Sequence, residues 1–134
     1  MSADGHAYLD SSAIVKLVVD EDETAALRTY LAGYPLRTAS ALVRTEVVRS
    51  VAPHGRAAVS RARVLLGTLN LVRVDDALLD AAAEVRPASV RSLDAIHLAC
   101  ALTLRPDPPV VVTYDLRMAE AARSYGLAVE APMP

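Results

Sequence analysis

Short apolar runs of strand length alternate with longer helical patterns along this chain of 134 residues. The clearest strand covers residues 110–113, because all four side chains are β-branched. Four other runs have strand length: residues 7–10, 36–39, 71–74 and 127–130. Strands that alternate with helices predict a parallel sheet with helices on both faces. The length fits a single domain over residues 1–134.

Helical patterns fill the intervals between these runs. The predicted helices cover residues 12–19, 20–32, 41–51, 57–69, 77–85, 92–104 and 116–125. Asp20 and Glu23 have the spacing of a capping box, which predicts where the second helix begins. Asp75 or Asp76 is expected to cap the helix that starts at residue 77. Since Phe and Trp are absent, the core is expected to consist mainly of Ala, Val and Leu.

Four acidic residues lie next to apolar residues, where a carboxylate is costly to bury. They are Asp10, Glu46, Asp94 and Asp115. A charge removed from water has to be paired or bind a metal ion. Asp10 ends the first predicted strand and Asp115 follows the fourth, so both reach one crevice if these strands are neighbours. Four converging carboxylates would form an oxygen-ligand site for Mg²⁺ or Mn²⁺.

Each acid also has an ordinary structural explanation. Asp10 suits a turn, and Asp115 suits the cap of the following helix. Asp94 falls in the first turn of a helix, where its charge favours the helix dipole. Glu46 has the spacing for an ion pair with Arg49. It is the joint occurrence of the four acids that favours a site.

Four segments of the chain resemble the acidic motifs of one protein family. Residues 8–17, Tyr-Leu-Asp-Ser-Ser-Ala-Ile-Val-Lys-Leu, resemble the opening motif of PIN-domain ribonucleases, in particular the VapC toxins of bacterial toxin–antitoxin pairs. Residues 39–46 resemble the second motif, and residues 93–99, with Asp-Ala-Ile-His, resemble the third. Residues 112–115 resemble the fourth. The motifs occur in the family's order over nearly the whole chain.

The resemblance implies a fold and an activity. The fold is a three-layer α/β/α PIN-like domain, with a central parallel sheet of four to five strands in which the first and fourth are adjacent. The activity is Mg²⁺- or Mn²⁺-dependent cleavage of RNA by the toxin of a toxin–antitoxin pair. The implied partner is a VapB-like antitoxin that blocks the site.

The four acids then take roles in catalysis. Asp10 and Asp94 are expected to be the principal metal ligands, and Asp115 to bind directly or through water. Glu46 is expected to complete the metal shell or to orient the attacking water.

Other polar residues have supporting roles. Ser12 and Thr113 are expected to hold carboxylates by hydrogen bonds. His97 follows Asp94 by one helical turn, so it is either a general acid or, more commonly, a structural residue. Several arginines are candidate contacts for RNA phosphates or antitoxin acids: Arg44, Arg49, Arg61 and Arg63.

Charge and cysteine content are compatible with this function. The formal net charge is −2, but eight of the 16 acidic residues belong to the four-carboxylate set and the run 20–23. The other eight acidic residues are outnumbered by the 14 basic ones, so the remaining surface is basic.

Cys100 is the only cysteine, which excludes an internal disulfide and a thiolate zinc cluster.

The chain shows no long apolar run, and residues 1–6 lack the pattern of a signal peptide. We therefore expect a cytoplasmic protein without a membrane anchor. Hydrophobic residues make up 53% of the chain, which predicts an exposed apolar groove or a homodimer face.

Three other classes of protein share part of this pattern. A phosphoacceptor receiver domain needs a lysine late in the chain, whereas the only lysine is Lys16. A phosphatase with an aspartate nucleophile needs a second acid at position 12, which is Ser12. A non-catalytic PIN-like domain that binds RNA or a protein partner remains the alternative.

Overall fold

The computed structural model of this protein describes residues 5–104 and 106–134. Residues 1–4, which belong to the segment predicted to lack a signal peptide, lie outside the described part. Within that part, no helix combines the length and the apolar character that crossing a membrane requires.

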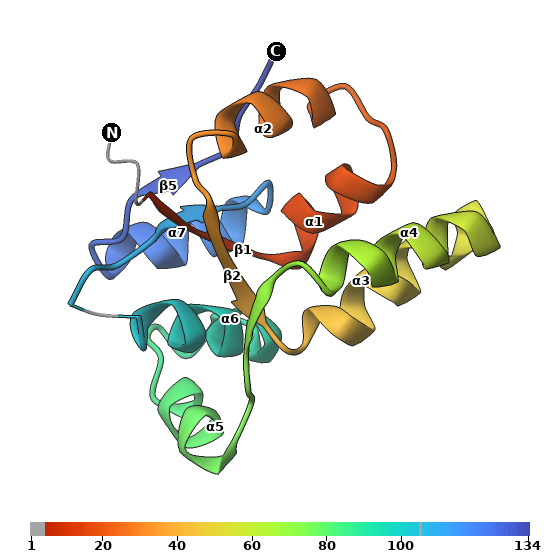
Figure 1. The fold of residues 1–134 in the computed structure, drawn as a ribbon. Helices are drawn as coiled ribbons and strands as arrows, with labels where there is room; N and C mark the ends of the chain where they lie inside the picture. The colour runs from red at the N-terminus through yellow and green to blue at the C-terminus, as the bar shows by residue number, and fades with distance from the viewer. Residues whose placement is uncertain (1–4, 105) are drawn as a thin grey trace.

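The described strands form one parallel sheet in the order β3-β2-β1-β4-β5 (Figure 1). Their bounds are β1 (His6–Leu9), β2 (Leu36–Ser40), β3 (Asn70–Val72), β4 (Val110–Val112) and β5 (Val129–Glu130). The first strand lies beside the fourth, with Tyr8 opposite Val111. This confirms the predicted neighbours, and it places the switch in strand order between β1 and β4.

Helices cover both faces of the sheet and complete the predicted three-layer α/β/α fold (Figure 1). Their bounds are α1 (Ser11–Val18), α2 (Thr24–Leu31), α3 (Val43–Val51), the 3-10 turn η1 (Ala52–His54), α4 (Arg56–Leu66), α5 (Asp76–Ala83), α6 (Ser92–Leu102) and α7 (Leu116–Ser124). Side chains alternate along β1, so Ala7 and Leu9 pack under α1 to α4, whereas Tyr8 packs under α5 to α7. The two buried clusters therefore lie on opposite faces of the sheet.

The predicted capping box is wrong. Helix α2 begins only at Thr24, and Glu23 makes no side-chain capping bond. Glu23 instead accepts a hydrogen bond from Lys16 Nζ at 2.8 Å, because the long Lys16 side chain reaches across from α1. By contrast, Asp75 caps α5 by accepting from the Leu78 backbone N–H at 2.9 Å.

Candidate active site

Asp10 is the buried carboxylate between β1 and α1. Its Oδ1 atom accepts hydrogen bonds from Ser12 Oγ at 2.6 Å and from the Ala13 backbone N–H at 3.2 Å. Its Oδ2 atom accepts from the Thr113 hydroxyl, which lies just beyond β4. Burial raises the pKa of Asp10, and the hydrogen bonds from Ser12 and Thr113 act against that rise. The two hydroxyl contacts predicted from the sequence are thus present.

Asp115 caps a helix through one carboxylate oxygen, and its second oxygen makes no hydrogen bond to the described residues. Its Oδ1 atom accepts from the backbone N–H groups of Arg117 at 2.9 Å and Met118 at 3.4 Å, so the residue does cap α7. Its own backbone N–H donates to Thr113 Oγ1 at 3.0 Å, which ties Asp115 to the residue that holds Asp10. No hydrogen bond within the described ranges engages Asp115 Oδ2. That atom is therefore available to a ligand.

Asp94 lies in the first turn of α6, about half buried. Burial raises its pKa first of all, and the negative charges of Asp115 and Asp10 raise it further, while His97 and Arg91 act in the opposite direction. Asp10 and Asp115 therefore both lie within electrostatic range of Asp94. The three acids come from β1, α6 and the end of β4, so the fold brings together residues distant in sequence.

Glu46 belongs to a hydrogen-bonded chain that starts in the core. His97 Nε2 lies 2.8 Å from Glu46 Oε1, and His97 Nδ1 lies 2.9 Å from the Tyr8 hydroxyl. Because a carboxylate only accepts hydrogen bonds, His97 Nε2 is the donor to Glu46, while Nδ1 is engaged by the Tyr8 hydroxyl. Both ring nitrogens of buried His97 are engaged, which favours the structural role for this residue.

The donor set fits a hard divalent cation. The candidate ligands supply only carboxylate oxygens, which Mg²⁺ and Mn²⁺ prefer. Among the described residues, no three His, Cys, Asp or Glu side chains stand close enough together to form a ready-made metal cage. Mg²⁺ keeps several waters and binds through one or two carboxylates, so a closed cage is not required. Asp10, Asp94 and Asp115 would hold the ion, with Glu46 at the edge of the site.

Sequence reasoning missed three residues beside the acids. Tyr8 holds His97 from the opposite direction to Glu46. Arg91 lies close enough to lower the pKa of Asp94. Arg117 donates its backbone N–H to Asp115. For both arginines a signal was present, since each stands within three residues of a motif acid.

One of the arginines considered from sequence has a structural contact. The guanidinium of Arg61 donates to the Val18 carbonyl oxygen, at 3.4 Å from Nε and 3.3 Å from Nη2, and so ties α4 to the end of α1. Arg61 is thereby the least free of that group to bind a phosphate.

Thr113→Val is expected to weaken Mn²⁺ binding by about tenfold. Removing a residue that hydrogen-bonds a metal ligand typically lowers metal affinity by about 10- to 100-fold, and Thr113 is expected at the lower end of that range. Valine keeps the shape of Thr113 but cannot donate to Asp10 or accept from the Asp115 N–H. Isothermal titration with Mn²⁺ measures the effect. Thr29→Val, on the exposed side of α2, is the matched control and should bind Mn²⁺ like the unaltered protein. Equal Mn²⁺ affinities for both variants would contradict this role of Thr113.

A family model matches most of this chain. The model described as PIN domain covers residues 7–124. Ribonuclease VapC46 of Mycobacterium tuberculosis (strain ATCC 25618 / H37Rv) is 50% identical over 125 residues, covering 93% of this chain and 96% of that protein.

Solved structures share the fold at low sequence identity. The crystal structure of Mycobacterium tuberculosis VapC20, whose title calls it a Sarcin-Ricin loop cleaving toxin, superposes with a TM-score of 0.71 at 20% identity, covering 86% of this chain and 94% of that one. A toxin-antitoxin complex from Klebsiella pneumoniae contains a chain that superposes with a TM-score of 0.67 at 20% identity. The match covers 81% of this chain and 86% of that one.

Proposed function

The chain belongs to the PIN-domain family of VapC-type ribonucleases, and from this we propose that it is a Mg²⁺- or Mn²⁺-dependent endoribonuclease. It hydrolyses RNA phosphodiester bonds as the toxin of a toxin–antitoxin pair. The observation that carries the proposal is that Asp10 and Asp115 are joined through Thr113 at the carboxyl edge of β1 and β4, with Asp94 close enough for both charges to raise its pKa. Such a cluster of acids is costly unless a cation offsets it.

Each acid takes a distinct role in the proposed reaction. A bound divalent ion would lower the pKa of a water and neutralise phosphate charge. Asp10 presents a fixed carboxylate, because Ser12 and Thr113 hold its two oxygens. Asp94 and Asp115 add negative charge on the open side of the site. Glu46, held by His97, orients a water at the edge of the cluster.

An antitoxin is the proposed protein partner. VapC is the name of the relative at 50% identity, and a structural neighbour comes from a toxin-antitoxin complex. A VapB-like antitoxin that covers the acids would block RNA access. A single domain over residues 1–134, a cytoplasmic location and a homodimer remain predictions. Exposed Val64, beside the half-buried Leu65 on α4, is a candidate apolar contact for such assemblies.

Purified protein is expected to cleave RNA with Mg²⁺ or Mn²⁺ and to lose all cleavage with EDTA, because the acids alone repel the phosphate. Excess Mn²⁺ should restore the activity. Total bacterial RNA, with mapping of the new RNA ends, is a suitable substrate. Cleavage that persists in EDTA would contradict metal dependence. RNA binding without any cleavage, at every metal concentration, would favour the non-catalytic alternative.

A further inference from the structure

A groove leads away from the candidate active site along α7. Its inner part is a cavity of about 450 Å³, whose lining includes Asp94, Arg91 and Arg117. Its outer part is a cavity of about 760 Å³, whose lining includes Arg86 and Tyr125. The two cavities share Pro87 and Ser124 as lining residues, so they adjoin. The groove is therefore continuous from the acidic cluster to the end of α7.

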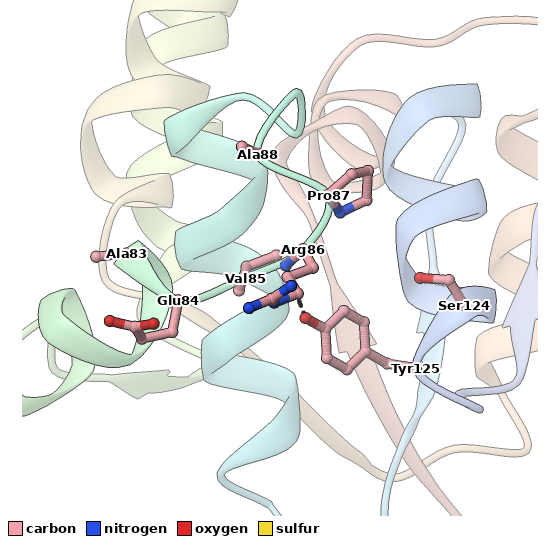
Figure 2. A pocket seen from close by; sticks show the side chains of 8 residues that line it. All are labelled: Ala83, Glu84, Val85, Arg86, Pro87, Ala88, Ser124 and Tyr125. Carbon is pink, nitrogen blue, oxygen red and sulfur yellow. Dashed lines mark hydrogen bonds between the residues drawn. The ribbon is translucent and has the colours of Figure 1, made fainter.

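Three arginines follow this groove from its inner to its outer end. Arg91 and Arg117 line the inner cavity together with Asp94. Arg86 lines the outer cavity, as Figure 2 shows. All three are exposed, and among the described residues none forms an ion pair with a carboxylate. Glu84, Asp94 and Glu120 also line the walls, so the acids equal the arginines in number, and a metal ion bound at Asp94 would leave the arginines in excess. The planar guanidinium donates two hydrogen bonds at once to a phosphate.

The outer arginine stands on a fixed backbone. The Arg86 backbone N–H donates to the Tyr125 hydroxyl at 2.8 Å, drawn as a dashed line in Figure 2. The Val90 N–H donates to the Pro87 carbonyl at 3.0 Å, which closes the turn before α6. The loop after α5 is thus joined to the end of α7. A side chain presented from such a loop loses little further backbone freedom when it binds a ligand.

We propose that this groove binds the single-stranded RNA segment next to the cleaved bond, with Arg91 and Arg117 at the nearest phosphates and Arg86 at a more distant one. The inference rests on the proposed ribonuclease function. Cavities of this size accept units as large as one nucleotide and not a duplex. A track of cations beside a catalytic centre is how single-stranded nucleic acid is commonly held. The groove begins at Asp94, where the substrate must pass, which favours RNA over an acidic protein segment.

The test compares RNA binding by paired variants in an Asp10→Asn background, which removes cleavage and leaves the groove lining intact. The probe is a fluorescein-labelled oligouridine of about ten nucleotides, followed by anisotropy at several salt concentrations. Arg86→Gln/Arg117→Gln removes two cations and keeps both backbone contacts. Arg91 is left in place because its charge also acts on Asp94. Arg28→Gln/Arg56→Gln is the matched control, since both arginines are exposed on helices of the opposite face.

The groove variant is expected to bind at least about tenfold more weakly, and its plot of log K against log salt should be shallower by about 1.4, since each phosphate contact on a single strand contributes about 0.7. The control pair should match the parent protein. Unchanged affinity and slope in the groove variant would overturn the inference, while cleavage of total RNA by the unaltered protein would leave the proposed function standing. If the unaltered protein cleaves no RNA, both fail. Lost antitoxin binding with unchanged RNA binding would assign the groove to the antitoxin and overturn the inference.

Discussion

Asp94→Asn is expected to abolish RNA cleavage, with a loss of at least about 10³-fold in kcat/KM. A bound metal ion stabilises the charge of the transition state by several kcal/mol, and each 1.36 kcal/mol changes the rate by a factor of about ten. Asparagine keeps the size of Asp94 but removes the negative charge that it adds near Asp10 and Asp115. Asp10→Asn is expected to have a similar effect. The measurement is cleavage of a labelled RNA with saturating Mn²⁺.

The same substitution should stabilise the metal-free protein at neutral pH. Folding raises the pKa of Asp94 above 3.8, so the folded protein favours the protonated carboxyl group. The stability that this preference contributes is lost as the pH rises through the raised pKa. In EDTA at neutral pH, Asp94→Asn should therefore melt at a higher temperature than the unaltered protein, and the difference should vanish at pH values well below 3.8. A lower melting temperature in EDTA would show that lost activity reflects a damaged fold.

Asp80→Asn is the matched control for both readouts. Asp80 is exposed on α5, on the same face of the sheet as α6, and it has no part in the acidic cluster. This variant should cleave RNA at the normal rate and keep its melting temperature. Wild-type cleavage by Asp94→Asn would remove Asp94 from the proposed metal ligands.

His97→Ala is expected to lower the free energy of unfolding by about 2–4 kcal/mol, because it leaves a cavity and removes two hydrogen bonds. The His97 side chain is buried and joins Tyr8 to Glu46 across 89 and 51 positions of sequence. Without the ring, the Tyr8 hydroxyl loses its contact with Nδ1, and Glu46 loses the hydrogen bond that orients it. Urea denaturation measures the stability. RNA cleavage should fall as well, since Glu46 is proposed to orient a water.

Two variants separate these effects. Tyr8→Phe removes only the hydroxyl, so it should cost about 1 kcal/mol and leave the bond between His97 and Glu46 in place, with cleavage nearly normal. His54→Ala, at an exposed position of η1, should change neither stability nor cleavage. Unaltered stability of His97→Ala would mean that the hydrogen-bonded chain contributes nothing to the fold. A general-acid role of His97 would instead reduce cleavage with little loss of stability.

The sheet and its helices were largely predictable, because their signals are local. Residues 110–113 are β-branched, and β4 forms there. Helix ends were less predictable: α4 ends at Leu66, with its C-cap at Gly67, instead of reaching residue 69. At the start of α2, Glu23 pairs with Lys16 of α1 and makes no capping bond, a contact between helices that the local pattern did not predict. Helix limits follow such competing contacts as much as they follow local propensity.

The sequence by itself placed Asp10 at the end of the first predicted strand and Asp115 just after the fourth, and parallel strands end on the same side of a sheet. That these two strands are neighbours was implied by the family resemblance and is confirmed by the pairing of β1 with β4. Only the tertiary structure decided which groups each acid meets. Thr113 bonds Asp10 across 103 positions, and Glu46 meets His97 rather than pairing with Arg49. The groove beyond Asp94 likewise forms only where the loop after α5 meets α7. These contacts depend on ångström-scale packing of elements distant in the chain, and no local sequence pattern encodes those distances.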